Sequence, residues 1–267
     1  MSLSALLFII GLESLACKIR QNKDVKGIKL PLHNYPKNEA KISLYADDIT
    51  IFVNDEREVK QTVNILNSFY EFSGLKLNTT KTEAMWVGSY RKSKQTIGDL
   101  KWKLYPNNVI KSLGIYFSSS KPAGEINDNW LPKINKIKNI IKVWQQRYLT
   151  MIGKIVIVKS LLSSQLSFVG SIIDIPEKVI KELDTLLFKY VWGGSEKVKR
   201  KTIIGEYSDG GLKMIHLQSF LNSLKATWIK RLTNASIATW KNIPLHEFNL
   251  NELKLDILKC NCSYITT

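Results

Sequence analysis

The amino-acid sequence predicts an α+β protein, in which helices on a small antiparallel sheet are followed by an all-helical region. Two observations lead to this expectation. Short β-prone runs alternate with helical patterns over residues 1–118, and after residue 124 the apolar residues recur at helical spacing. The chain has 267 residues, of which 44% are hydrophobic, so it is long enough to bury a core.

The elements of the mixed region follow from its apolar periodicity. An apolar segment over residues 3–21 predicts a helix that is buried beneath a sheet. A helical stripe later in the region ends at Gly74, which is a plausible stop because glycine readily ends helices. In chain order, we expect two strands joined in a hairpin over residues 42–53, a helix over 56–72, and strands over 83–87 and 113–117.

The helical region is predicted from apolar residues at alternating steps of four and three. One such stripe predicts a long amphipathic helix and comprises Trp130, Ile134, Ile137, Ile141, Trp144 and Tyr148. A second helix is expected over residues 152–166, and a third begins with Pro176 in its first turn and runs to Val191. These helices are expected to form a small bundle. The pattern is helical again over residues 219–232.

The charge of the chain indicates a polyanionic partner. Lys plus Arg number 39 and Asp plus Glu 23, a net charge of +16, which suits nucleic acid or an acidic membrane; a soluble basic protein is the alternative. The apolar run from Leu3 to Leu12 lacks a basic leader, is interrupted by Glu13 and is too short to cross a bilayer. We therefore expect neither secretion nor a membrane partner.

The cysteines favour an intracellular protein, and the basic run over residues 197–201 makes the nucleus one option. Cys17, Cys260 and Cys262 leave an odd thiol and no ladder of spaced pairs, which argues against a secreted disulfide scaffold. Cys260 and Cys262 with His246 could form half of a zinc site, but ordinary thiols are the favoured interpretation. The sequence does not determine the oligomeric state.

The chemically most informative segment is Tyr45-Ala46-Asp47-Asp48, which sets two carboxylates inside the apolar, β-prone run of residues 42–53. No Lys or Arg lies in that run to neutralise them, so a divalent cation is the natural partner. Successive strand side chains point to opposite faces, so both carboxylates can face one metal only if a turn redirects one. We expect Asp47 to be the main ligand and Asp48 the lesser one. The alternative is an ordinary hairpin turn, where Asp is common.

The neighbouring motifs extend this pattern. Gly74-Leu75-Lys76-Leu77-Asn78 is followed by Lys81-Thr82 and, farther on, by Leu113-Gly114-Ile115. In this order the motifs resemble the palm of reverse transcriptases from non-LTR (LINE-type) retrotransposons. By resemblance, the carboxylate segment is the third palm motif, the glycine-led segment the fourth, and Leu113-Gly114-Ile115 the primer-grip turn. Leu3-Ser4 is similar to the end of the second motif of that family. Two later segments, Tyr190–Gly194 and Gly210–Leu212, resemble the part of that family that follows the thumb.

The resemblance implies an RNA-directed DNA polymerase that acts on an RNA template and a DNA primer. Two Mg²⁺ (or Mn²⁺) ions would assist nucleotidyl transfer. The implied catalytic residues are Asp47, Asp48 and Lys81, with Asp47 and Asp48 as metal ligands; the implied primer-binding residues are Tyr45, Ala46, Leu113 and Gly114. The implied domains are a partial palm over residues 1–123, a helical thumb over 124–194, and a post-thumb linker with the C-terminal segment over 195–267.

Basic side chains of the helical region suit contacts with phosphates, which make no sequence demands. The expected contact residues are Lys133, Lys136, Lys142, Arg147, Lys197, Lys199, Arg200 and Lys201. Solvation of an outer face is the alternative for each of them, and the run over residues 197–201 also fits a nuclear-import signal. Residues 90–110 mix further cations with Trp102 and Tyr105; we favour a solvated basic hairpin there, with nucleic-acid contact as the alternative.

One departure from the family pattern limits the expected activity. A two-metal palm takes another carboxylate from a separate strand, but Glu13, Asp24 and Glu39 are the acidic residues before Asp47, and none lies in a β-prone run. The chain also begins within the second motif and lacks the fingers. We therefore expect a truncated polymerase that is inactive in isolation. The alternatives are a catalytically dead nucleic-acid-binding remnant and, more distantly, a group II intron maturase-like protein.

Overall fold

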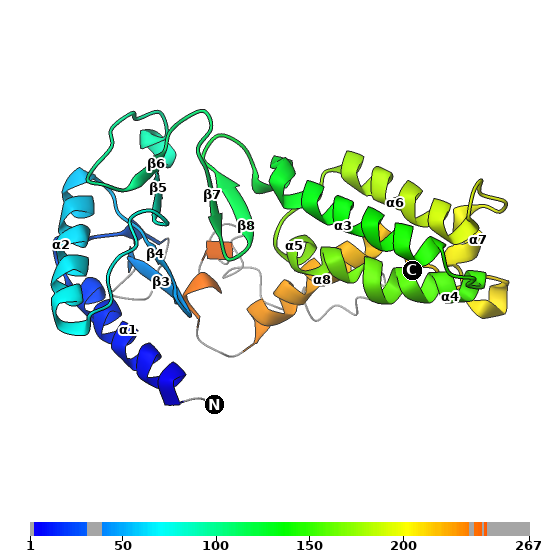
Figure 1. The fold of residues 1–267 in the computed structure, drawn as a ribbon, viewed down its shortest axis with the longest axis horizontal. Helices are drawn as coiled ribbons and strands as arrows, with labels where there is room; N and C mark the ends of the chain where they lie inside the picture. The colour runs from blue at the N-terminus through cyan, green and yellow to red at the C-terminus, as the bar shows by residue number, and fades with distance from the viewer. Residues whose placement is uncertain (1–2, 31–38, 235–237, 242, 245–267) are drawn as a thin grey trace. The chain divides into compact units, whose positions relative to one another are not determined.

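The computed structural model describes residues 3–30, 39–234, 238–241 and 243–244 (Figure 1). The chain divides into two compact units. Of the residues that the structure describes, we call those up to residue 113, together with 238–244, the hairpin unit, and residues 114–234 the helical unit. The division falls before the boundary that the sequence predicted after residue 123. Residues 195–234, expected as a separate segment, share a unit with the predicted thumb.

The hairpin unit alternates helices and short strands, as the sequence predicted. Its strands form two-stranded sheets. β3 with β4 is antiparallel, as expected; β1 with β2 is also antiparallel, in a region where the sequence predicted a loop, and β5 with β6 is parallel. β7 and β8 form a further two-stranded sheet. In chain order, the elements are α1 (Leu3–Gln21), β1 (Ile28–Lys29), β2 (Glu39–Ala40), β3 (Ile42–Tyr45), β4 (Asp48–Ile51), α2 (Glu56–Ser73), β5 (Glu83–Met85), η1 (Gly88–Tyr90), β6 (Lys101–Lys103), β7 (Val109–Ser112) and η5 (Thr239–Lys241).

Helix α2 has a local signal at each end. The side chain of Asp55 accepts a hydrogen bond from the backbone N–H of Glu58, which satisfies one of the free donors of the first turn. At the other end, Gly74 has φ 70°, a left-handed conformation that favours glycine, and its N–H donates to the carbonyl of Tyr70. The predicted end of this helix at Gly74 is confirmed.

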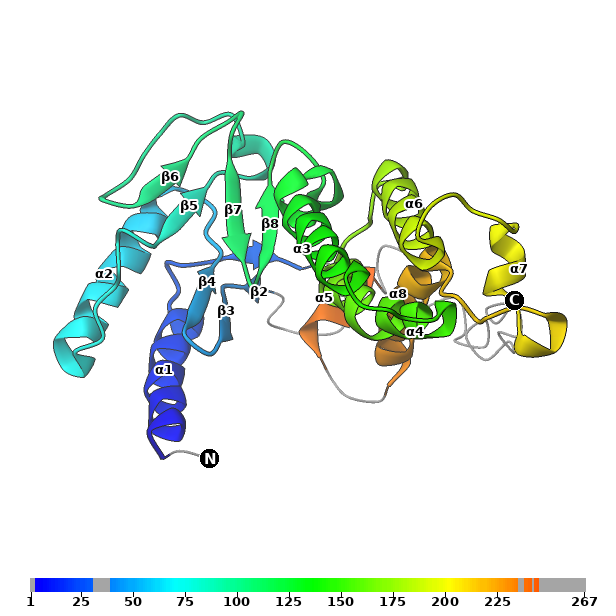
Figure 2. The same cartoon turned by 45° about the vertical axis from the view of Figure 1, so that its right-hand side comes forward.

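The apolar side of the β3–β4 hairpin packs against α1 and α2 (Figures 1 and 2). Buried Leu15, Ile19 and Ile65 form this small core together with the partly buried hairpin residues Ile42, Ile49 and Ile51. The first turns of α1 lie outside it, with Leu7 59% and Ile10 67% exposed. The expectation of a buried helix is therefore wrong for this part of α1, because its contacts with the core begin near Leu12.

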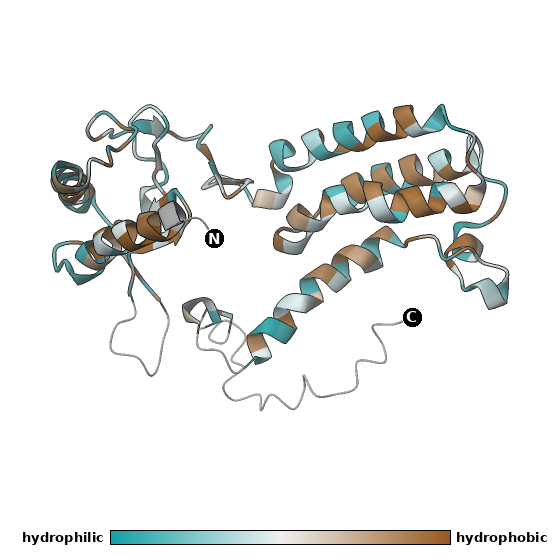
Figure 3. Ribbon diagram, turned by 60° about the horizontal axis from the view of Figure 1, so that its bottom comes forward, coloured by the Kyte–Doolittle hydropathy of each residue, from teal (hydrophilic) through white to brown (hydrophobic). Residues whose placement is uncertain are grey.

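The helical unit is built around one continuous apolar cluster. Buried residues of α3, α5, α6 and α8 contribute to it, including Ile137, Leu166, Leu183 and Leu217. Figure 3 shows hydrophobic and hydrophilic residues alternating along these helices, as amphipathic packing requires. In chain order, the elements are β8 (Ile115–Ser118), η2 (Ala123–Glu125), α3 (Asn127–Gln145), α4 (Met151–Ile157), η3 (Val158–Leu162), α5 (Ser164–Ile172), α6 (Glu177–Trp192), α7 (Arg200–Ile204), η4 (Tyr207–Asp209) and α8 (Leu217–Thr233).

Two details of the bundle differ from the sequence-based expectation. The predicted second helix is longer and irregular, because η3 is a π-helical turn between α4 and α5. Tyr148 does not belong to the α3 stripe: α3 ends at Gln145, a tight turn follows, and the Tyr148 side chain is fully exposed. The turn is closed by the N–H of Arg147, which donates to the Trp144 carbonyl over 3.2 Å.

Across the described ranges, no single helix is both long and apolar enough to cross a membrane. The segments Met151–Leu162 and Ser164–Ile172 meet that test only jointly, and they are bent by 44° at the break between them.

Candidate functional site

The β3–β4 hairpin places its two carboxylates differently. Its apolar side chains face the small core, and alternation along each strand turns Tyr45 and Asp48 to the opposite side. Asp47 lies in the connecting turn. The cross-strand pairs are Ile42 with Ile51, Ser43 with Thr50, Leu44 with Ile49, and Tyr45 with Asp48. The hairpin therefore offers one carboxylate from a strand end and one from the adjoining turn.

The tip of the hairpin is exposed. Tyr45 is 68% exposed, and the side chains of Asp47 and Asp48 are exposed as well. Ala46 has φ 52°, an uncommon conformation for a residue other than glycine, which the flanking strand pairs hold in place. The prediction that the carboxylates sit in a mostly dehydrated run is wrong, because the apolar residues face the core while the turn projects into solvent. Burial alone therefore does not require a metal here.

Lys41 anchors the beginning of the hairpin. Its ammonium group donates to the carbonyls of Arg20, over 3.2 Å, and Asn22, over 2.8 Å, at the C-terminal end of α1. A cation is favourable at the negative end of a helix. Lys41 also pairs with Glu39 over 3.5 Å, and its side chain is only 11% exposed. The sequence analysis did not single out Lys41, although a lysine directly before a β-prone run was the available signal.

Glu58 anchors the other end of the hairpin. Its carboxylate is buried and accepts hydrogen bonds from the N–H of Gly27 (3.4 Å) and the N–H of Asn54 (3.0 Å). The Asn54 side-chain amide also donates to Glu58, over 3.3 Å, and to the carbonyl of Gly27, over 2.6 Å. Because these donors satisfy the buried carboxylate, they fasten α2 to the segments that flank β1 and β4.

Two of the three acidic residues before the hairpin are paired with basic side chains. Glu13 pairs with Arg20 over 2.6 Å, and Glu39 pairs with Lys41. Asp24 lies in an exposed turn that the side chain of Asn22 closes. Among the residues with a described placement, no group of three or more His, Cys, Asp or Glu side chains could hold a metal ion. The candidate site therefore rests on Asp47 and Asp48.

The remaining predicted palm residues lie on two other turns. Lys81 is exposed, and its N–H donates to the side chain of Asn78 over 3.1 Å, which shapes the turn before β5. Leu113 and Gly114 connect β7 and β8 with φ 47° and 82°. The structure thus gathers Tyr45 to Asp48 in one turn, and it holds Lys81 and the Leu113-Gly114 pair on separate, well-formed turns.

The predicted phosphate-contact residues of the helical unit differ in their exposure to solvent and in their local contacts. Lys136, Lys142 and Arg147 are exposed, while Lys133 is partly buried. Lys197, Lys199 and Lys201 are also exposed. Arg200 instead forms an ion pair with Glu196 over 2.5 Å, and its guanidinium lies 4.7 Å from the ring centre of Phe188. The hydrogen bonds that Arg200 donates to the Glu196 carboxylate raise the pKa of Arg200, so this side chain is committed to a local contact.

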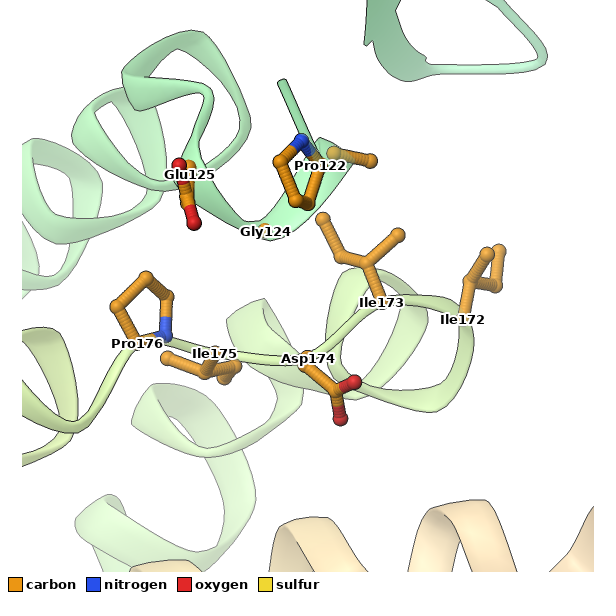
Figure 4. Close-up of a pocket in the computed structure, with 9 residues that line it drawn as sticks. Pro122, Gly124, Glu125, Ile172, Ile173, Asp174, Ile175 and Pro176 are labelled. Carbon is orange, nitrogen blue, oxygen red and sulfur yellow. The ribbon is translucent and has the colours of Figure 1, made fainter.

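An open pocket in the helical unit lies between residues 122–125 and 172–176 (Figure 4). Its lining includes none of the residues that the sequence predicted for the site. Asp174, one of its two acidic residues, is paired with Lys225. His246, Cys260 and Cys262, considered above as half of a zinc site, lie outside the described residues.

Comparisons with known proteins support the resemblance noted in the sequence, independently of the geometry. The family model described as "Reverse transcriptase (RNA-dependent DNA polymerase)" matches residues 1–151. The chain is similar to the uncharacterized 149 kDa protein of transposon TX1 from Xenopus laevis, with 22% identity over 236 residues, which are 86% of this chain and 17% of that protein. It is also similar to the retrovirus-related Pol polyprotein of the type-1 retrotransposable element R2 from Popillia japonica. That match has 22% identity over 219 residues, 76% of this chain and 44% of that protein. The chain thus spans less than half of either relative.

Proposed function

We propose that this chain, which belongs to the reverse transcriptase (RNA-dependent DNA polymerase) family, serves template-directed DNA synthesis by holding a divalent cation at its β3–β4 hairpin. The relatives are proteins of non-LTR retrotransposons, so the type that the motif order predicted is confirmed. One observation carries the proposal. Two adjacent carboxylates are presented to solvent by a hairpin whose other face is anchored in a core.

The donor set fits one hard cation. Polymerases of this family generally use divalent metal ions, and Mg²⁺ is commonly held by one or two carboxylates together with water and substrate phosphates. Asp47 and Asp48 supply two such carboxylates from adjacent positions. A cation held there would stabilise charge on the phosphates and activate the primer hydroxyl. Within the described part of the chain no third acidic side chain joins the pair, so a second ion would need a ligand from elsewhere.

The other residues of the proposed site would contact the primer or the triphosphate rather than the cation. Tyr45 leaves the strand on the same side as Asp48 and is exposed, which suits contact with the primer end beside the turn of Ala46. Lys81 would bring a positive charge to the triphosphate, and Leu113 with Gly114 would support the primer. A family member has nucleic-acid substrates in general. We propose that an RNA template and a DNA primer are the partners of this one, inside the cell and with the nucleus as one option.

Manganese binding tests the metal site directly. We expect Mn²⁺, detected by the loss of its free-ion electron paramagnetic resonance signal, to bind the full chain. Asp47→Ala should weaken that binding by about tenfold or more, because one of two carboxylate ligands is lost, and Asp48→Ala should weaken it less. Asp24→Ala is the matched control, since Asp24 is an exposed acid in the same unit. If Asp47→Ala and Asp24→Ala bind Mn²⁺ equally well, the hairpin is not a metal site.

Primer extension separates the polymerase from its principal alternative. With only two carboxylates at the site, we expect no extension of a DNA primer on an RNA template by this chain alone with Mg²⁺. Extension that disappears in Asp47→Ala would overturn that expectation and show that the two carboxylates suffice. A catalytically dead nucleic-acid-binding remnant predicts a different pattern, namely duplex binding without Mn²⁺ binding at the hairpin.

The helical unit is the proposed contact for the duplex. For binding that depends on phosphate contacts, the logarithm of the association constant falls linearly as the logarithm of the salt concentration rises, with a slope set by the number of contacts. Replacement of Lys136, Lys142 and Arg147 by alanine should reduce that slope by about 2 to 3 for a DNA duplex, because three exposed cations of the α3 segment are lost. A slope equal to that of the unaltered chain would assign these cations to solvation.

A further inference from the structure

We propose that the segment Gly88–Lys94, called here the Tyr90 loop, binds single-stranded RNA with Tyr90 as the ring on which a base stacks. The proposal rests on the function above, because the RNA is taken to be a template strand. The loop lies in the hairpin unit, between β5 and β6, and includes none of the residues assigned to the metal or primer sites.

The first requirement is an aromatic surface that a base can reach. Tyr90 is 53% exposed, and its ring centre lies 5.9 Å from that of Trp86, at an angle of 40°. Trp86 is only 7% exposed and stacks on Trp102, with 4.7 Å between ring centres and an angle of 26°. Base–aromatic stacking tolerates any sequence, because every base has a π face. Tyr90 is therefore an accessible ring with a buried aromatic layer beside it.

The second requirement is that the ring be held in place before the strand arrives. The indole N–H of Trp86 donates to the carbonyl of Gln95 over 2.9 Å, and that of Trp102 donates to the carbonyl of Ile97 over 3.1 Å. Within the loop, the N–H of Ser93 donates to the carbonyl of Tyr90 over 2.8 Å. Because these bonds fix the loop on its aromatic base, binding loses less conformational freedom.

The third requirement is positive charge for the phosphates. Arg91, Lys92 and Lys94 are exposed, and none of them forms an ion pair with a described carboxylate. No acidic residue occurs from Ala84 to Gly98. The nearby carboxylate of Glu83 is occupied by Lys101, over 3.6 Å, and Lys103, over 3.1 Å. The loop therefore presents three unpaired cations beside its ring, the combination by which proteins track single strands.

These features select single-stranded RNA over a duplex. Bases of a duplex stay stacked on one another, whereas unpaired bases are free to stack on an aromatic side chain. The hydroxyl of Ser89, next to Tyr90, is exposed and can exchange a hydrogen bond with a ribose 2′-hydroxyl, which DNA lacks. The partner is therefore taken to be a short unpaired RNA segment.

Fluorescence anisotropy with a labelled, unstructured 12-nucleotide RNA tests the proposal on the full chain. Tyr90→Ala should weaken binding by about 5- to 100-fold, as loss of one stacked base predicts, while Tyr90→Phe should stay within about twofold because it keeps the ring. The matched control is Tyr70→Ala, which removes another exposed tyrosine of the same unit. The Arg91→Ala/Lys92→Ala/Lys94→Ala variant should reduce the salt slope more than the control Lys18→Ala/Lys23→Ala/Lys60→Ala, which removes equal charge from exposed positions.

Each outcome decides one point. Equal RNA affinity for Tyr90→Ala and Tyr70→Ala overturns the proposal, as does an equal loss for Tyr90→Ala and Tyr90→Phe. The unaltered chain should bind the 12-nucleotide RNA more tightly than a DNA of the same sequence, and equal affinities for the two overturn the assignment to RNA. The assay contains neither metal nor nucleotide. Failure here with Mn²⁺ binding intact therefore rejects the Tyr90 loop alone, and loss of Mn²⁺ binding with this result intact rejects the metal site alone.

Discussion

The helical unit and the hairpin unit bury their apolar side chains in different ways. The helical unit has one continuous cluster that joins β8 to α8, whereas the hairpin unit has two small clusters, one beneath the β3–β4 hairpin and one around Trp86. A small core contributes less free energy of folding, so directed polar contacts matter more in the hairpin unit. There, Lys41 and Glu58 fasten the two ends of the hairpin to α1 and α2.

This difference matches the two proposed tasks. A site that holds a cation needs two carboxylates at fixed positions, and hydrogen bonds from buried groups provide direction that apolar packing lacks. A surface that contacts a nucleic acid backbone needs rigid helices with charges on the outside, and one apolar cluster is enough to provide them. The hairpin unit should thus be sensitive to loss of polar contacts, and the helical unit to loss of packing.

Replacing one buried isoleucine in each unit by alanine should give the largest losses in the free energy of unfolding. Ile137 in the helical unit is fully buried and Ile65 in the hairpin unit is 4% exposed, and each loses the same atoms when replaced by alanine. We expect each substitution to lower the free energy of unfolding by about 2 to 5 kcal/mol, with Ile137→Ala at the upper end because more of its neighbours are buried. Denaturant titrations followed by circular dichroism measure both. A larger loss for Ile65→Ala would reverse the comparison.

Glu58→Ala should show the importance of polar contacts in the hairpin unit. The substitution leaves the N–H groups of Gly27 and Asn54 without their acceptor, which should cost about 1 to 3 kcal/mol in the free energy of unfolding. Glu71→Ala, at an exposed position of the same helix, should change it by less than about 0.5 kcal/mol. Equal unfolding midpoints for the two variants would mean that the Glu58 contacts do not hold the unit together.

Gly124→Ala tests backbone packing in the helical unit. A methyl group at Gly124 would lie 2.2 Å from the backbone carbonyl oxygen of Asp174, so the two segments would have to move apart. We expect a loss of about 1 to 3 kcal/mol, measured as a lower unfolding midpoint. Gly11→Ala is the control, because that position in α1 is open; it should gain about 0.5 to 1 kcal/mol from helix propensity. A stable Gly124→Ala variant would show that these segments are free to separate.

The smallest expected effect is the pH dependence of Asp184. Partial burial raises its pKa above the ordinary value of 3.8, although His216 and Arg200 oppose the shift. Because the folded-state pKa exceeds the unfolded one, the associated stability is present below 3.8 and is lost as the pH rises through the folded-state value. Asp184→Asn should therefore flatten the stability–pH curve just above 3.8 and be slightly more stable at pH 7. Parallel curves for the two proteins would contradict this assignment.

Local signals predicted several elements well. The end of α2 at Gly74 was predicted, and the β-prone runs around residues 45–48 became the predicted hairpin, because capping and turn preferences act within a few residues. The exposed first half of α1 and the exposed Tyr148 were not predicted. Periodicity shows that a segment has an apolar side, but it does not show whether another segment covers that side.

By itself, the sequence determined the order of the elements, the place of the Asp47-Asp48 pair and the family, because motifs and periodicity are properties of neighbouring residues. The tertiary structure alone decided that the carboxylates lie at an exposed tip and that Lys41 and Glu58 hold the hairpin through contacts with distant segments. It also stacked Trp102 on Trp86, the ring that lies beside Tyr90. Burial and long-range pairing depend on residues distant in the chain, and only the fold brings them together.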